Sequence, residues 1–298
     1  MAGLLGSSSD RRGAALRELF EAGEMVLAPG CYDALGARLI EEAGFRAAYM
    51  TGFGSAASRL GRPDIGLMSM PEMVDNARRI VSAIDIPVIA DADTGYGNSI
   101  NVIRTVQEYE AAGVAAIHLE DQVMPKKCGH MDGKQVVPIP EMVSKVSAAV
   151  AARRSADFLI IARTDARAVY GLDVALERAR AYREAGADAL FVEAPQSESE
   201  IEAIAQAFPD VPLLFNYAEG GKTPAVGYRF LQSLGFALVI FPLTLLLSAT
   251  GAMRAALARV KSDGTPIELL PSLVGFEEFL DLVGIDEIRE LEQRFAEG

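Results

Sequence analysis

Short apolar or β-branched runs recur along the chain, and amphipathic, alanine-rich stretches separate them. Eight such runs cover residues 25–29, 47–51, 87–91, 115–120, 158–163, 189–193, 212–216 and 236–241. They are almost continuously apolar, as strands buried on both faces of a parallel sheet are. The stretches between them have the spacing of one helix face, for example over residues 35–43, 100–112, 174–185 and 245–260. The pattern therefore predicts a strand–helix unit repeated eight times.

Eight strand–helix units are the number that closes a TIM-type (β/α)8 barrel, so this α/β fold is the one we expect. The alternative is an open, doubly wound sheet, which requires a glycine motif that cradles phosphate after its first strand. Residues 30–33, Gly-Cys-Tyr-Asp, are not such a motif. The barrel is therefore preferred.

The domain organisation follows from this interpretation, since a barrel of about 250 residues folds as one domain. We expect residues 1–298 to form a single barrel domain with a flexible N-terminus over about residues 1–12. A C-terminal helical extension is expected over about residues 270–298, with two short acidic helices between 276 and 295. This extension either caps the barrel or packs on a neighbouring subunit.

The composition and net charge of the chain argue against some classes of binding partner. The chain is 50% apolar and 23% charged, which suits a large buried core. Its formal net charge of −13 repels phosphate backbones and anionic lipid, so neither nucleic acid nor a membrane is an expected partner. The longest apolar run, 236–253, is interrupted by Pro242 and does not suit a bilayer span. Two cysteines give no disulfide framework, which favours the cytoplasm.

Polar residues end most of the predicted strands, at the edge where barrel enzymes carry their active sites. Asp91 and Asp93 follow the third strand and Glu120 ends the fourth. Two like charges 4 Å apart cost about 4 kcal/mol at an effective dielectric of 20, and a hard divalent cation such as Mg²⁺ or Mn²⁺ relieves that repulsion. The alternative is that these acids cap helices or accept backbone N–H groups.

The segment Lys126-Lys-Cys-Gly-His130 follows the fourth strand. Neighbouring lysines and an imidazole are expected to lower the pKa of the Cys128 thiol and make it a nucleophile or a proton donor. Cys128 and His130 alone are too few ligands for a zinc site, and the spacing also fits an ordinary loop cysteine. Cys31 is interpreted as structural and His118, inside an apolar strand, as a core histidine.

Two further features at the strand ends suit an anionic substrate. Arg163 offers a planar fork for a carboxylate, although an ion pair with Glu193 would also explain it. The backbone N–H groups of Thr51, Gly52 and Phe53 follow the second strand and are expected to point at an oxyanion.

Four motifs together resemble the isocitrate lyase and phosphoenolpyruvate mutase superfamily. They are Asp-Ala-Asp-Thr-Gly-Tyr-Gly-Asn at 91–98, Glu-Asp at 120–121, Pro-Lys-Lys-Cys-Gly-His at 125–130 and Ile-Ala-Arg-Thr-Asp at 161–165. The cysteine loop resembles the lyase branch, with its 2,3-dimethylmalate lyases, methylisocitrate lyases and petal-death proteins. The resemblance implies an α/β barrel, Mg²⁺ at the strand ends, a small carboxylate substrate, and a homotetramer that exchanges a C-terminal helix between subunits.

The resemblance also implies roles for individual residues. Asp91 would be the principal metal ligand, with Asp64, Asp93 and Glu120 around it, partly through water. Cys128 would protonate the carbanion that leaves, while Lys126, His130, Glu193 and Arg163 complete the catalytic group. The residues expected to bind substrate are Tyr49, Thr51, Gly52, Phe53, Gly129, Arg163 and Asn216.

The function predicted on this basis is a Mg²⁺-dependent carbon–carbon lyase that cleaves a branched 2-hydroxy di- or tricarboxylate to pyruvate and a second carboxylate. A 2,3-dimethylmalate-like or 2-methylisocitrate-like acid is the expected substrate. The alternatives are a carboxyphosphonoenolpyruvate or phosphoenolpyruvate phosphonomutase, an oxaloacetate-hydrolysing enzyme, a Schiff-base aldolase that uses Lys126, and a non-catalytic barrel that binds a metabolite. Relatives that hydrolyse oxaloacetate tend to carry serine near the position of Pro242, which argues against that activity.

Overall fold

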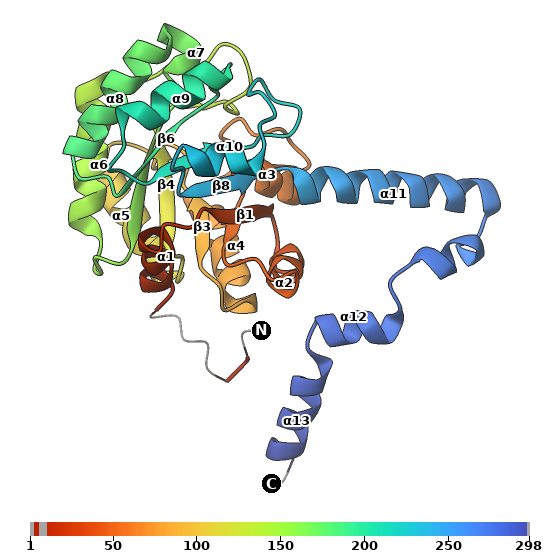
Figure 1. Ribbon diagram of the computed structural model, residues 1–298. Coiled ribbons are helices and arrows are strands. Elements are labelled where there is room, and N and C mark those ends of the chain that lie inside the picture. Colours follow the sequence, from red (N-terminus) through yellow and green to blue (C-terminus); the bar gives the residue numbers. More distant parts are fainter. Residues whose placement is uncertain (1–2, 6–10, 297–298) are drawn as a thin grey trace.

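Eight parallel strands pair in sequence order and close into a barrel in the computed structural model, which describes residues 3–5 and 11–296 (Figure 1). The strands are β1 (Val26–Cys31), β2 (Ala48–Met50), β3 (Val88–Asp91), β4 (Ala116–Glu120), β5 (Leu159–Thr164), β6 (Ala189–Val192), β7 (Leu213–Asn216) and β8 (Leu238–Phe241). Closure is made by β1 and β8, which run in register from Val26 opposite Leu238 to Pro29 opposite Phe241. The predicted (β/α)8 barrel is confirmed, and every strand end lies within two residues of its predicted position.

Helices alternate with the strands and surround the barrel (Figure 1). Several begin with a side chain that accepts a hydrogen bond from the first turn of the helix, as Asp33, Thr51, Asn98 and Ser197 do. Among the described residues, no helix is both long and apolar enough to span a bilayer. The helices around the barrel are α1 (Arg12–Glu21), α2 (Ala34–Glu42), α3 (Gly52–Leu60), α4 (Met70–Ala83), α5 (Ser99–Ala111), α6 (Ile139–Ala152), α7 (Arg167–Tyr170), α8 (Leu172–Glu184), α9 (Glu198–Ala207) and α10 (Tyr228–Ser233).

Side chains alternate along each strand between the barrel lumen and the surrounding helices. Apolar inward residues fill the lower lumen, among them Val26, Ala28, Ile89, Leu159, Phe191 and Leu214. The same alternation carries polar residues into the lumen at the C-terminal ends of the strands, so that Glu120 and Arg163 lie opposite each other in the β4–β5 register. The alternation therefore places the predicted site at one end of the barrel.

The residues that follow these two point outwards instead. Asp121 accepts hydrogen bonds from Thr164 Oγ1 at 2.8 Å, Tyr182 OH at 2.8 Å and Arg178 Nη1 at 3.1 Å. Tyr182 and Arg178 belong to α8. This buried network anchors α8 to β4 and β5 directly behind the lumen.

Helix α1 covers the opposite, N-terminal end of the barrel. Leu16 is fully buried in the lumen cluster, and Phe20 lies beside Leu159 and Pro212 where their strands begin. Arg12 is buried and donates hydrogen bonds to the carbonyl oxygens of Val81 and Ile84, at 3.0 and 2.6 Å. The N-terminus predicted to be flexible therefore does not extend to Arg12, and residues 1–2 and 6–10 lie outside the described part of the chain.

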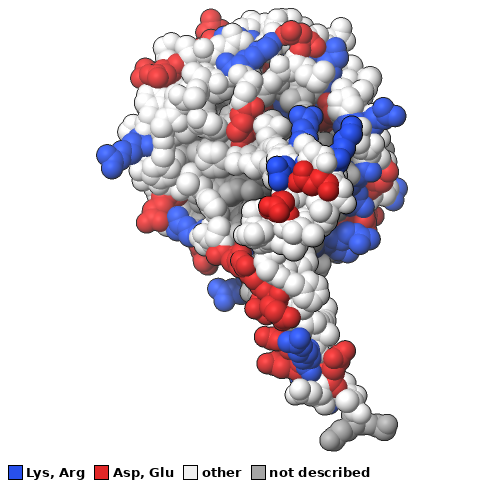
Figure 2. All heavy atoms as spheres, turned by 90° about the vertical axis from the view of Figure 1, so that its right-hand side faces the viewer, with Lys and Arg blue, Asp and Glu red and all other residues white. Residues whose placement is uncertain are grey.

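The C-terminal segment forms an arm that extends away from the barrel (Figures 1 and 2). It comprises α11 (Thr244–Asp263), a 3-10 helix (Ile267–Ser272), α12 (Phe276–Leu282) and α13 (Ile285–Phe295), so the two predicted acidic helices are present. None of residues 244–296 is fully buried, and apolar side chains such as Leu257 and Phe276 are 69% and 74% exposed. The arm contacts the barrel through Arg38 Nη1, which donates to the Leu282 carbonyl at 3.3 Å.

Candidate active site

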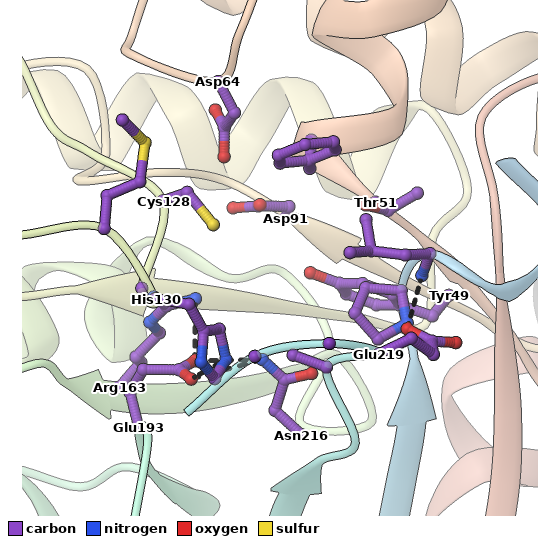
Figure 3. A pocket seen from close by; sticks show the side chains of 18 of the residues that line it. Tyr49, Thr51, Asp64, Asp91, Cys128, His130, Arg163, Glu193, Asn216 and Glu219 are labelled. Atoms are coloured by element: carbon purple, nitrogen blue, oxygen red, sulfur yellow. Dashed lines mark hydrogen bonds and ion pairs between the residues drawn. The ribbon is translucent and has the colours of Figure 1, made fainter. Parts of the chain in front are cut away.

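A cavity of about 250 Å³ lies at the C-terminal ends of the strands (Figure 3). Most residues predicted to carry chemistry line it: Tyr49, Thr51, Phe53, Asp64, Asp91, Lys126, Cys128, Gly129, His130, Arg163, Glu193 and Asn216. Gly52, Asp93 and Glu120 do not line the cavity but contact residues that do. The structure therefore brings the whole predicted set together.

The predicted metal-binding carboxylates surround a lysine. Lys126 Nζ lies 2.5 Å from Asp64 Oδ1 and 2.7 Å from Asp93 Oδ1. Burial alone would lower the pKa of Lys126, but Asp93, Asp64 and Asp91 raise it well above its usual value. Burial also raises the pKa of Asp93, to about 6, against the opposing effect of Lys126. Lys126 is therefore a fixed positive charge within the acidic cluster.

These carboxylates leave oxygen atoms that suit a hard cation. Asp91 Oδ1 accepts a hydrogen bond from Asp93 N at 2.9 Å, and Figure 3 shows the Asp91 side chain directed into the cavity. Glu120 Oε2 contacts Arg163 Nε at 3.2 Å, whereas Glu120 Oε1 is buried with no hydrogen-bond partner among the described residues. In that part of the chain, no three His, Cys, Asp or Glu side chains converge closely enough to hold a metal ion as they stand. The all-oxygen donor set fits Mg²⁺ bound partly through water.

Cys128 lies in the loop between β4 and α6, and its thiol points into the cavity towards Asp91 (Figure 3). Its N–H donates to the Asp64 carbonyl at 3.2 Å. The expected lowering of its pKa is wrong: burial raises the pKa, and the charges of Asp64 and Glu193 add to this effect. The lysines next to it in sequence point elsewhere, Lys126 to the carboxylates and Lys127 to the carbonyl oxygens of residues 132 and 133. The thiol is therefore protonated near neutral pH, which favours an acid over a nucleophile.

His130, in the loop after β4, and Glu193, which follows β6, form a pair at the cavity. His130 Nδ1 accepts a hydrogen bond from Lys222 N at 3.0 Å, so the ring proton is on Nε2, which lies 3.0 Å from Glu193 Oε1. Burial opposes ionisation of Glu193, but Arg163 and His130 lower its pKa. Asn216 Nδ2 also donates to Glu193, at 3.2 Å, and Asn216 Oδ1 is buried without a hydrogen-bond partner in the described chain. That oxygen is available to accept a hydrogen bond from a ligand.

Arg163 is held by three carboxylates and an aromatic ring. Asp165 accepts from Arg163 Nε at 2.9 Å and from Nη2 at 3.1 Å, while Glu193 Oε2 lies 3.3 Å from Nη1. The guanidinium also lies 4.9 Å from the centre of the Phe191 ring. The ion pair with Glu193 is thus present, and Arg163 faces the cavity as well. Sequence reasoning gave no role to Asp165, although its position two residues after Arg163 places it on the same side of the strand.

The second strand provides fewer free N–H groups than expected. Thr51 N donates to the Cys31 carbonyl at 3.1 Å, so its N–H is not free for an oxyanion, and the expectation for Thr51 is wrong. Gly52 and Phe53 begin α3, and N–H groups in the first turn of a helix have no partner within the helix. A Cβ at Gly52 would lie 2.3 Å from Asp91 Oδ2, so only glycine permits this approach.

Two residues interpreted as structural are buried below the cavity. His118 is fully buried, lies 2.8 Å from Tyr49 OH, and has a pKa lowered to about 4 by burial, so it is neutral. Cys31 is also fully buried, and burial raises its pKa to about 12. Both are core residues, as predicted, and His118 additionally orients the Tyr49 hydroxyl.

Part of the cavity wall comes from the loops after β7 and β8, which contribute Ala218, Glu219, Gly220, Gly221, Pro242 and Leu243. Of these residues the sequence singled out Pro242 alone, as a position that separates related activities. Glu219 joins the two loops, since it accepts hydrogen bonds from Leu243 N at 3.1 Å and from Thr244 Oγ1. The one signal in the sequence for these wall residues was that both loops follow predicted strands.

Comparison with known proteins agrees with this geometry. Residues 16–261 match the phosphoenolpyruvate phosphomutase family. A 2,3-dimethylmalate lyase of Eubacterium barkeri is 51% identical over 96% of this chain and 98% of its own, and a 2-methylisocitrate lyase of Aeropyrum pernix is 44% identical over 100% and 94%. The solved complex of a phosphonopyruvate hydrolase with oxalate and Mg²⁺ superposes with a TM-score of 0.88 at 35% identity, covering 96% of this chain and 99% of the other. The chain therefore belongs to the phosphoenolpyruvate mutase/isocitrate lyase superfamily of enzymes, in its lyase branch.

Proposed function

We propose that this protein is a Mg²⁺-dependent lyase that cleaves a branched 2-hydroxy di- or tricarboxylate into pyruvate and a second carboxylate. The observation that carries the proposal is the protonated, half-buried Cys128 thiol, which faces Asp91 across the cavity that Arg163 also lines. The names of the lyase relatives support substrates of the 2,3-dimethylmalate or 2-methylisocitrate type.

The metal would be held by Asp91, with Asp64, Asp93 and Glu120 contributing partly through water. The unpartnered Glu120 Oε1 supports this assignment, as does the Mg²⁺ in the related oxalate complex. When bound, Mg²⁺ polarises a substrate oxygen and stabilises the negative charge that develops on it. Mn²⁺ offers the same ligand preferences.

The chain's own residues bind the substrate and move the protons. Arg163 and the N–H groups of Gly52 and Phe53 suit the carboxylate of the pyruvate half, and Asn216 Oδ1 suits a hydroxyl. Tyr49, Thr51 and Gly129 form the wall around that half.

In the reaction, the 2-hydroxyl group loses its proton and its oxygen becomes the carbonyl of the 2-oxo acid. The bond between C2 and C3 breaks, and its electron pair moves to C3, next to the second carboxylate. The Cys128 thiol donates its proton to C3 and becomes a thiolate. The proton lost by the hydroxyl returns to the thiolate through the His130–Glu193 pair, while Lys126 stays protonated and tunes the transfer as a fixed positive charge, so no proton is consumed overall.

The carboxylates around Lys126 argue against the Schiff-base alternative. An amine attacks a carbonyl only when it is neutral, and the carboxylates around Lys126 raise its pKa well above the usual value. A protonated Lys126 suits a metal-assisted reaction instead.

The exposed apolar side chains of the C-terminal arm support a homotetramer in which the arm packs on a neighbouring subunit. Apolar surface of this extent in a monomer marks an interaction site. Besides Leu257 and Phe276, the exposed apolar residues of the arm include Met253, Ile267, Leu270, Val274 and Phe295.

The test measures pyruvate release from 2-hydroxy di- and tricarboxylates, coupled to lactate dehydrogenase and NADH, and oxalate release from oxaloacetate, each with Mg²⁺ and with EDTA. Release from one branched acid that stops with EDTA supports the proposal and names the substrate. If no acid in the panel is cleaved in the presence of Mg²⁺, the lyase proposal is refuted. Turnover of a phosphonate would then assign the phosphonomutase alternative.

A further inference from the structure

We propose that Lys134 is a positioning residue that ties the peptide carrying Cys128 to the carboxylate that holds Arg163. This inference rests on the proposed lyase reaction. Lys134 lies in the loop between β4 and α6, and its side chain is 1% exposed. Its ammonium group donates to the Gly129 carbonyl oxygen and, at 3.0 Å, to Asp165 Oδ1. A buried ammonium is stable only with such acceptors, which fixes its place.

The peptide around the thiol is held from three directions. On its N-terminal side, the Gln122 amide donates to Lys127 O at 2.8 Å and accepts from Lys127 N at 2.9 Å. The cysteine N–H donates to the Asp64 carbonyl at 3.2 Å. On its C-terminal side, Lys134 holds the Gly129 carbonyl. Loss of Lys134 would therefore release one side of the segment that aims the thiol.

The second contact of Lys134 leads to the substrate-binding side of the cavity. Asp165 Oδ1 accepts from both Lys134 Nζ and Arg163 Nη2, at 3.0 and 3.1 Å, and Asp165 is fully buried. A single ammonium thus connects the group proposed to donate the proton with the group proposed to bind the carboxylate. We infer that Lys134 fixes the separation between these two groups, which act on opposite halves of the substrate.

Lys127 provides a matched control in the same loop. Its ammonium also donates to two backbone carbonyl oxygens, those of Asp132 and Gly133, at 3.3 and 2.9 Å. These hydrogen bonds lie on the exposed side of the loop, and the Lys127 side chain does not line the cavity. Lys127→Met therefore removes an ammonium and two hydrogen bonds without touching the link to Asp165.

The kinetic test compares Lys134→Met with Lys127→Met in the pyruvate-release assay. A misplacement of about 1 Å in a reacting group costs about 10²-fold in rate, so kcat of Lys134→Met is expected to fall by about 10- to 100-fold. Lys127→Met is expected to stay within about twofold of the wild type. If Lys134 acts by aiming the thiol, adding Lys134→Met to Cys128→Ser produces little further loss. A full multiplicative loss in the double variant would overturn the proposal that Lys134 aims the thiol.

A second readout needs no turnover. Alkylation of Cys128 by iodoacetamide, followed by mass spectrometry, is expected to be several-fold faster in Lys134→Met than in the wild type and unchanged in Lys127→Met. Equal rates in all three proteins would overturn the proposal. If the wild type releases no pyruvate, the lyase assignment fails, while the alkylation rates still decide whether Lys134 holds the thiol. If Lys134→Met does not fold by thermal unfolding, Lys134→Gln, which keeps an N–H donor, replaces it.

Discussion

The close approach of Gly52 to Asp91 gives a sharp prediction for the variant Gly52→Ala. The added Cβ would lie 2.3 Å from Asp91 Oδ2 and 3.0 Å from Asp91 Cγ, so the carboxylate or the start of α3 must move. Asp91 is only 4% exposed, and its other oxygen accepts from Asp93 N at 2.9 Å, so the side chain has little room to turn.

The magnitude follows from the size of the required shift. Ordinary van der Waals contact needs a separation of more than about 3.4 Å, so relief of the clash displaces atoms by about 1 Å. Overpacking of this kind costs about 1–3 kcal/mol of unfolding free energy. A shift of about 1 Å in the principal metal-binding carboxylate is expected to lower kcat/KM by about 10²-fold and to raise the Mg²⁺ concentration needed for half-maximal rate.

The assay is pyruvate release as a function of substrate and Mg²⁺, with urea unfolding to measure stability. Gly227→Ala is the matched control, because a Cβ there meets no atom within 4 Å and the backbone φ of −77° suits alanine. The control is expected to retain wild-type kinetics. A Gly52→Ala protein with kcat/KM within about twofold of the wild type and the same Mg²⁺ dependence would refute the reasoning.

Three further predictions follow from other parts of the structure. Cys128→Ser is expected to lower kcat by about 10²- to 10⁴-fold without changing oxalate affinity measured by calorimetry, and an unchanged kcat would remove the thiol from the mechanism. Because burial raises the thiol pKa and an acid acts in its protonated form, the wild-type rate is expected to fall only as pH rises above the usual thiol pKa of about 8.5, and a Cys128-dependent fall below that pH would contradict the assignment. Arg178→Met leaves the buried Asp121 carboxylate without its ion pair, so urea unfolding is expected to show a loss of about 3 kcal/mol, and a loss below about 1 kcal/mol would count against this network.

Much of the fold could be predicted because the barrel depends on a pattern that is local in sequence. Apolar runs of strand length alternate with amphipathic stretches, and this alternation located all eight strands within two residues. The candidate site followed from the same pattern, because residues two apart in a strand point to the same face. A polar residue two positions after an inward apolar residue therefore also points into the lumen. Arg163 follows Ile161 in this way, and Glu193 follows Phe191.

The rest depended on where long side chains in loops point, which periodicity does not determine. Lys126 and Lys127 adjoin Cys128 in sequence and were expected to lower its pKa, yet both ammonium groups turn away and burial dominates. Lys134 and Asp165 meet across 31 residues of sequence, and nothing in the pattern around either one marks the other as its partner.

The alternation at the ends of β4 and β5 limits how this enzyme can change during evolution. Glu120 and Arg163 face the lumen, while the next residues, Asp121 and Thr164, face the network that holds α8. Insertion or deletion of one residue within either strand would exchange the inward and outward positions. Asp121 or Thr164 would then face the cavity, and Glu120 or Arg163 would face α8. Such a change removes activity and stability in one step. New specificities on this scaffold are therefore accessible through point substitutions and through loops of variable length, whereas the lengths of its strands are fixed.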